Sequence, residues 1–164
     1  LEVVQRFNDR AKVGYSIPDS IGPRSEPFAF ALGQSWKQIN DVFQFHLIQK
    51  HLESGIVISE LPGKLDLKTS TYYAIKRRLS QHGFDFESIP TKLPIKMKSA
   101  ESSALNSYVS GLTDLTWHLA NEQFEKEIIE YLFKQVGYQK TKLAQELDIS
   151  YPTVLQKTKS LKRI

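Results

Sequence analysis

Side chains that suit nucleic-acid contacts gather near the end of this chain of 164 residues. In a helix that begins after Ser150, the residues Val154, Thr158 and Leu161 share one face and point inward. The opposite face combines hydroxyl, amide and ammonium groups, which can bond to base edges and pair with phosphates. The residues of that outer face are Tyr151, Thr153, Gln156, Lys157 and Ser160, with Lys159, Lys162 and Arg163 nearby.

The net charge of +4 is distributed unevenly along the chain. Residues 56–82 contain five Lys and Arg against two Asp and Glu, residues 138–164 contain six against two, and the remainder contains 11 against 14. Clustered cations indicate a polyanionic partner, because phosphate contacts need positive charge in one place. The alternative is two solvated helix ends that are rich in lysine.

The residue types and spacings do not match a catalytic or metal-binding pattern. Cysteine is missing from the sequence, which excludes disulfides, iron–sulfur clusters and thiol nucleophiles. Lys64 follows Gly63, but the other residues of a Walker A loop are lacking. The four histidines have no metalloprotease spacing, and the acidic residues are scattered. We therefore expect no enzyme activity, no metal and no cofactor.

Helical periodicity dominates the elements that must position these side chains. Apolar residues recur at helical spacing over 36–52, after the candidate N-cap Ser35, and again over 105–119 and 124–136. The segments 28–30 and 56–58 suggest strands but are too short to found a sheet. The sequence therefore predicts an all-α fold, a helical bundle.

Breaks in the pattern divide the chain. Residues 14–27 are rich in Pro and Gly, and residues 88–102 are rich in Pro, Lys and Ser. We expect an N-terminal helical unit at 1–87, a linker at 88–102 and a C-terminal unit at 103–164. No apolar run is long enough to cross a membrane, and the start lacks an initiator Met, so we expect part of a longer protein without a membrane partner.

An internal repeat relates the two basic stretches at a fixed offset of 82 residues. Because any two amphipathic helices can share leucines, the Gly, Asp and Thr pairs carry most of the argument. Chance resemblance between two helical stretches is the alternative. The identical pairs are Gly55 and Gly137, Leu61 and Leu143, Leu65 and Leu147, Asp66 and Asp148, Thr71 and Thr153, and Leu79 and Leu161.

The second copy of the repeat has the layout of a helix-turn-helix. Residues 141–147 form a short helix and residues 148–150 a tight turn. Ser150 then caps a second helix, with Pro152 in its first turn, where a missing N–H costs nothing.

The run from Lys140 to Lys157, followed by Lys159 and Leu161, resembles the Fis-type helix-turn-helix of the nucleoid protein Fis and of bacterial enhancer-binding (NtrC-like) transcription activators. The resemblance covers residues 122–164 and depends on the Lys-Thr-Lys start, Ala144, the Leu-x-Ile turn and the Thr-x-x-x-Lys of the second helix. Asp148 and Leu143 depart from the usual Gly and Ala, and Asp tolerates a left-handed turn. The resemblance implies that Ser150 and Tyr151 lie at base edges, whereas Gln139, Thr141, Thr153 and Gln156 approach phosphates.

The first copy is more degenerate. Pro62 and Gly63 fall within its first helix, which must be shortened or begin at about Leu61. The stretch 68–73 offers a capped start and aromatic groups, and residues 76–78 are three consecutive cations. The alternative is a former binding unit that now serves packing or dimerisation.

We expect a sequence-specific transcriptional regulator that places helices in the major groove of double-stranded DNA, in the cytoplasm at the nucleoid. The alternative is a helical oligomerisation or docking module of a larger regulator. The candidate DNA-binding residues are Gln139, Lys140, Thr141, Ser150, Tyr151, Thr153, Gln156, Lys157 and Lys159 in the second copy, with Lys68, Thr69, Thr71, Lys76 and Arg77 in the first.

A homodimer is expected, with other transcription components as further candidate partners. The apolar stripes of 104–119 and 124–136 are broader than one short unit can cover, so another helix must pack there. The alternative is that the helix at 35–54 supplies this partner within the same chain, which would make one chain a pseudo-dimer.

Overall fold

The computed structural model describes residues 26–87, 93–159 and 161, and within them regular structure is helical, with no strand. This confirms the expected all-α class. The strand-like segments 28–30 and 56–58 instead lie in or beside short 3-10 turns. The elements are η2 (Ala29–Ala31), α1 (Trp36–Glu53), η3 (Ile58–Glu60), α2 (Leu61–Lys64), α3 (Thr69–Gln81), α4 (Ser99–Ser110), α5 (Trp117–Gln135), α6 (Lys140–Leu147) and α7 (Tyr151–Thr158).

Helix α1 begins where the sequence predicts. The Ser35 side chain accepts a hydrogen bond from the Gln38 backbone N–H at 3.2 Å, and the Gln38 side chain accepts one from the Ser35 N–H at 3.1 Å. This reciprocal cap satisfies two donors that the first turn leaves free. The helix ends at Glu53, and Gly55 takes a left-handed φ of 86°.

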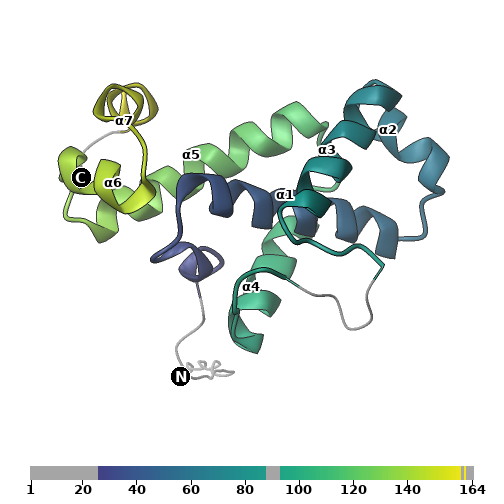
Figure 1. Ribbon diagram of the computed structural model, residues 1–164, viewed down its shortest axis with the longest axis horizontal. Helices are drawn as coiled ribbons and strands as arrows, with labels where there is room; N and C mark the ends of the chain where they lie inside the picture. The colour runs from purple at the N-terminus through teal and green to yellow at the C-terminus, as the bar shows by residue number, and fades with distance from the viewer. Residues whose placement is uncertain (1–25, 88–92, 160, 162–164) are drawn as a thin grey trace, which may run out of the picture.

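Helices α1 and α5 pack against each other and run in opposite directions, which Figure 1 shows along the length of the molecule. The Phe43 and Phe124 rings are stacked, with centroids 3.9 Å apart and an interplanar angle of 1°. Nearby, the Gln44 amide donates to Asn121 Oδ1 at 3.0 Å. Both phenylalanines are fully buried, so this contact lies at the centre of the helix pair.

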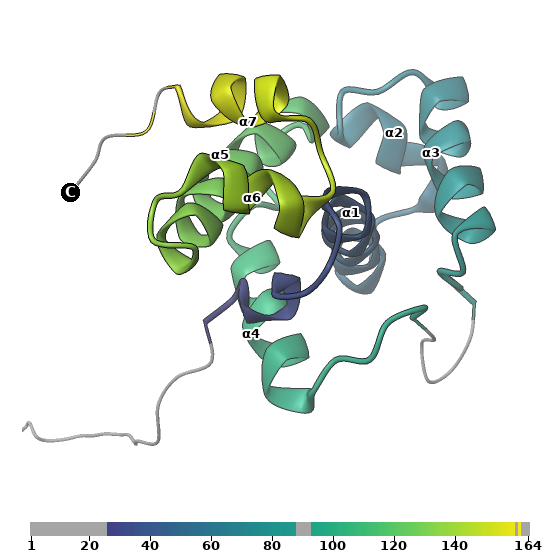
Figure 2. The same ribbon diagram turned by 60° about the vertical axis from the view of Figure 1, so that its left-hand side comes forward.

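The helices expected at 104–119 and 124–136 have other bounds, because a break follows residue 110 and one continuous helix covers 117–135. Helix α4 ends at Ser110, before Gly111, and α5 begins at Trp117 after the N-cap Thr116, whose hydroxyl accepts from Leu119 N–H at 3.4 Å. Helix α4 also begins at Ser99, within the range expected to be a linker. It packs on α1, away from α3 and α7 in both views (Figures 1 and 2).

A single cluster of buried side chains extends through both halves of the chain. It includes Val42 of α1, Leu79 of α3, Phe124 of α5 and Val154 of α7, all fully buried. The apolar side chains of α5 from Ala120 to Phe133 are therefore covered by helices of the same chain, whereas Leu119 is exposed. One of these helices is α1, which the sequence analysis gave as the alternative partner within the same chain. The expected homodimer stays a prediction, and burial of α5 does not require it.

The backbone repeats at the offset found in the sequence. Asp66 and Asp148 have left-handed φ angles of 59° and 56°. The residue after each aspartate closes the same turn: Leu67 N–H donates to Pro62 O at 2.8 Å, and Ile149 N–H to Ala144 O at 3.1 Å. We call residues 58–81 (η3, α2 and α3) the first unit and residues 140–158 (α6 and α7) the second unit. As Pro62 and Gly63 predict, α2 is reduced to four residues.

Candidate nucleic-acid interface

The second unit is held together by its caps and its inner face. The Ser150 hydroxyl accepts from Thr153 N–H at 3.3 Å and so starts α7, with Pro152 in the first turn. Val154 and Thr158 are buried, and the Thr158 hydroxyl donates to Val154 O at 2.8 Å. The expected cap and turn are therefore confirmed, and so are two residues of the inner face, whereas the third, Leu161, lies beyond the end of α7 and is half-buried.

Several of the expected contact residues share one open surface of α6 and α7. Tyr151 is 44% exposed, and Lys159 also faces solvent, whereas the exposed Gln156 lines the groove between α5 and α7. A shallow groove of about 440 Å³ lies between the two helices. Its lining includes Thr141, Gln145, Ser150 and Tyr151. Gln139, the exposed N-cap of α6, and the half-buried Lys140 stand at the start of the same helix.

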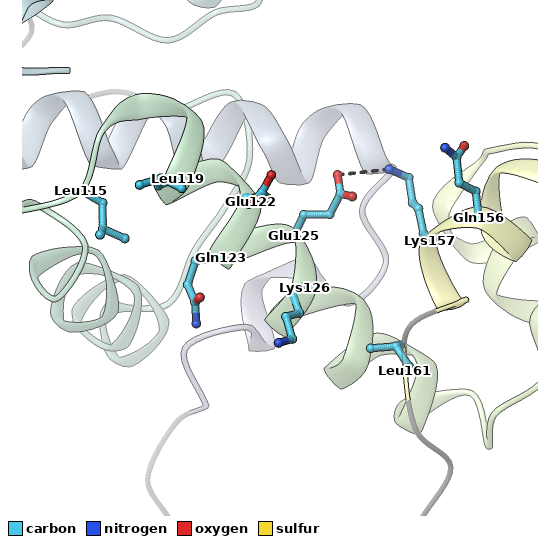
Figure 3. A pocket seen from close by; sticks show the side chains of 9 residues that line it. All are labelled: Leu115, Leu119, Glu122, Gln123, Glu125, Lys126, Gln156, Lys157 and Leu161. Carbon is cyan, nitrogen blue, oxygen red and sulfur yellow. Dashed lines mark hydrogen bonds and ion pairs between the residues drawn. The ribbon is translucent and has the colours of Figure 1, made fainter. Parts of the chain in front are cut away.

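Lys157 does not belong to this open surface. Its ammonium lies 3.1 Å from Glu125 Oε1 and 4.7 Å from the centre of the Trp36 ring, and only 16% of its side chain is exposed. Figure 3 shows this side chain turned toward α5, at the edge of a groove of about 650 Å³ between α5 and α7. A charge that is paired within the chain is a poor phosphate ligand, so Lys157 serves to hold α7 on α5. Ser160, Lys162 and Arg163 lie outside the described residues.

In the first unit the expected contact residues divide in the same way. Lys68, Thr69, Thr71 and Arg77 are exposed on α3. Lys76 is half-buried, with its ammonium 5.8 Å from the Tyr72 ring centre and 5.1 Å from that of Phe86. The expected side-chain cap is not formed: the N-cap of α3 is Lys68, whose side chain accepts no capping hydrogen bond.

Polar contacts fix α3 on α1. His82 Nδ1 lies 2.7 Å from the Asp41 carboxylate, and Arg78 lies 3.7 Å from the same carboxylate and donates to the Gln44 side chain. Tyr72 is fully buried, and burial raises the pKa of its hydroxyl. Arg78 and Tyr72 thus hold α3 in place, and the exposed groups of α3 include its small hydroxyls, Tyr73 and Arg77.

Two histidines of α1 belong to the core. His46 Nδ1 lies 2.8 Å from Val42 O, and burial lowers the pKa of His46. His51 is 1% exposed, and among the described residues neither of its ring nitrogens has a hydrogen-bond partner. Burial first, and then the charge of Lys64, lowers the pKa of His51. Burial therefore favours the neutral form of both imidazoles.

Two exposed apolar side chains at matching positions were not among the predicted contact residues, although the aromatic groups of 68–73 were noted. Tyr73 of α3 is 44% exposed and Leu155 of α7 is 41% exposed. They align at the 82-residue offset, so the repeat was the signal that could have found them. Apolar side chains on such a helix face can contact thymine methyl groups.

The described residues hold no group of three or more His, Asp or Glu side chains that could bind a metal ion. Within the same ranges, no helix is both long and apolar enough to cross a membrane. The arrangement offers hydrogen-bonding, cationic and apolar groups on two helices. Such groups can contact the base edges and phosphates of a nucleic acid.

Comparison with protein families, with curated proteins and with solved structures gives no match to this chain. The similarity to Fis-type units therefore stays a prediction from residues 122–164.

Proposed function

We propose that this chain is a sequence-specific DNA-binding regulator of transcription that presents α3 and α7 to the major groove. The observation that carries the proposal is the repeated unit: two short helical units with the same left-handed turn lie at opposite ends of the α1–α5 pair. The outer helix face of the second unit carries hydroxyl, amide and cationic groups, and that of the first unit carries hydroxyl and cationic groups. An action at the nucleoid, with other transcription components as partners, follows from the same proposal.

Charge and exposure agree with this role. Arg77 and Lys159 are exposed and align at the 82-residue offset, so each unit has an exposed cation at the same position. The first basic stretch of the sequence falls on the first unit, and Lys140, Lys142 and Lys157 of the second stretch fall on the second unit. A duplex that contacts both helices would release counterions from several phosphates at once.

Binding to a mixed-sequence duplex, measured by fluorescence anisotropy across a range of salt concentrations, tests the proposal. Each lost phosphate contact should reduce the slope of log affinity against log salt by about 0.9. We expect Arg77→Ala and Lys159→Ala each to cause this change, and the double variant to cause twice the change. Lys157→Ala is the matched control, since its ammonium already pairs with Glu125, and its slope should equal that of the unmodified chain.

A slope near zero for the unmodified chain would remove the proposal. It would favour the alternative, a helical docking module, for which one observation speaks. The groove between α5 and α7 is lined by Leu115, Leu119 and Leu161, and Leu119 is 48% exposed.

A further inference from the structure

The two units share a backbone but present different chemistry. Three exposed positions of each outer helix that align at the 82-residue offset carry unlike side chains. At the first position the first unit has an ammonium where the second has a hydroxyl, and at the next it has a small hydroxyl where the second has a phenol. At the third position the first unit has a methyl group where the second has an amide. The pairs, first unit then second, are Lys68 and Ser150, Thr69 and Tyr151, and Ala74 and Gln156.

The starts of the units differ even more. Gln139 and Lys140 begin α6, and the residues that align with them in the first unit are Val57 and Ile58. These two apolar side chains are 57% and 52% exposed. The polar and cationic groups at this position of the second unit thus have no counterpart in the first.

The two unlike units are held in a fixed, nearly two-fold relation. Phe43 and Phe124, whose rings stack, fall within one residue of equivalent positions in the repeat. Helices α1 and α5 run in opposite directions across this contact. At one end, Trp117 N–H donates to Leu65 O of the first unit at 2.9 Å. At the other end, Gln34 lies with Leu147 of the second unit in the lining of one small cavity. Each long helix therefore begins against the opposite unit.

From this we infer that one chain recognises a bipartite DNA site whose two half-sites are inverted in orientation but different in sequence. The inference rests on the proposed DNA-binding function. A homodimer presents the same helix twice and selects a palindrome, because the protein symmetry is repeated in the site. Here the two-fold relation is internal, and the side chains at the candidate base-reading positions differ between the halves.

Selection of bound sequences from randomised duplexes tests this, with native mass spectrometry of the selected complexes. We expect a non-palindromic site with one chain per duplex. In the variant Lys68→Ser, Thr69→Tyr, Ala74→Gln, three exposed residues of α3 become copies of their α7 counterparts, and the selected site should shift toward an inverted repeat of the half-site read by α7. Thermal melting by circular dichroism checks that this variant is folded.

A single exposed substitution supplies a second test that does not depend on the triple variant. Tyr151→Thr should change preference at positions of one half-site only, by roughly 5- to 150-fold against the best base, and leave the other half unchanged. Selection of a palindrome bound by two chains would overturn the inference while leaving DNA binding intact. A change of base preference in both half-sites with Tyr151→Thr would overturn it as well. Loss of the proposed function is recognised separately, by a salt slope near zero before any selection is done.

Discussion

Removing the aromatic ring at the centre of the α1–α5 pair should weaken both halves of the protein together. Phe124 is fully buried and stacks on Phe43 at 3.9 Å. Truncating such a ring to Ala costs about 3–5 kcal/mol. A domain of this kind has a total stability of roughly 5–15 kcal/mol, so Phe124→Ala should stay folded at low temperature but lose a large share of its stability.

The two tryptophans make the assay specific to each half. Trp36 begins α1 and lies near Lys157 of the second unit, and Trp117 begins α5 and bonds to Leu65 of the first unit. The variants Trp36→Phe and Trp117→Phe each leave one reporter for urea unfolding followed by fluorescence. With an m-value of roughly 2 kcal/mol/M, Phe124→Ala should lower the midpoint by about 1.5–2.5 M.

Both reporters should give the same midpoint and the same shift. Leu119→Ala provides the control on the same helix, since Leu119 is 48% exposed and its truncation should change stability by no more than about 0.5 kcal/mol. If the two reporters gave different midpoints, or if Phe124→Ala moved only one, the halves would be independent and the reasoning from a shared core would be refuted.

Two further predictions concern buried and strained positions. The first is His51→Phe, which introduces the residue found at the equivalent position of the repeat, Phe133. Because the pKa of His51 is lowered in the folded protein, the unfolded chain takes up a proton first as the pH falls through about 6.5, and the stability of the protein decreases toward acid pH. Urea unfolding at pH 7.5 and 5.5 should therefore show a smaller decrease in stability for the variant. An equal decrease in both proteins would show that His51 does not contribute, with His46 as the remaining buried imidazole. The second is Asp148→Val, which should lower the free energy of unfolding by about 1–2 kcal/mol in the same measurement, because a β-branched residue is strained at a φ of 56°. The control variant Asp148→Gly should avoid that strain. Equal stability of the Val and Gly variants would contradict the role of the turn.

Much of the local structure could be predicted because its signals are local. Ser35 and Ser150 precede the helices that they cap, and both caps form as expected. Pro62 and Gly63 shorten α2 as predicted. The helix boundary at 111–116 was missed, since Leu112 and Leu115 continue the apolar spacing through a break that Gly111 and the Thr116 cap impose.

The candidate site was predicted in part. Exposure of Tyr151 and Gln156 agrees with the outer face read from the sequence, and the candidate cations Lys159 and Arg77 are exposed as well. Lys157 was placed on the outer face because periodicity shows only where a Cα lies. A long side chain can turn back toward a neighbouring helix, and Glu125 is 32 residues away in the chain.

The sequence by itself determined the helical class, the turn at Asp148 and the 82-residue repeat, because periodicity, capping and left-handed turns depend on residues close together in the chain. Only the tertiary structure decided that α1 covers α5, that the Lys157 charge is paired, and that the two units lie at opposite ends of one helix pair. Those facts depend on contacts such as Phe43 with Phe124, between residues far apart in sequence. Such contacts form when burial of apolar surface selects one packing among several that the same amphipathic faces would allow.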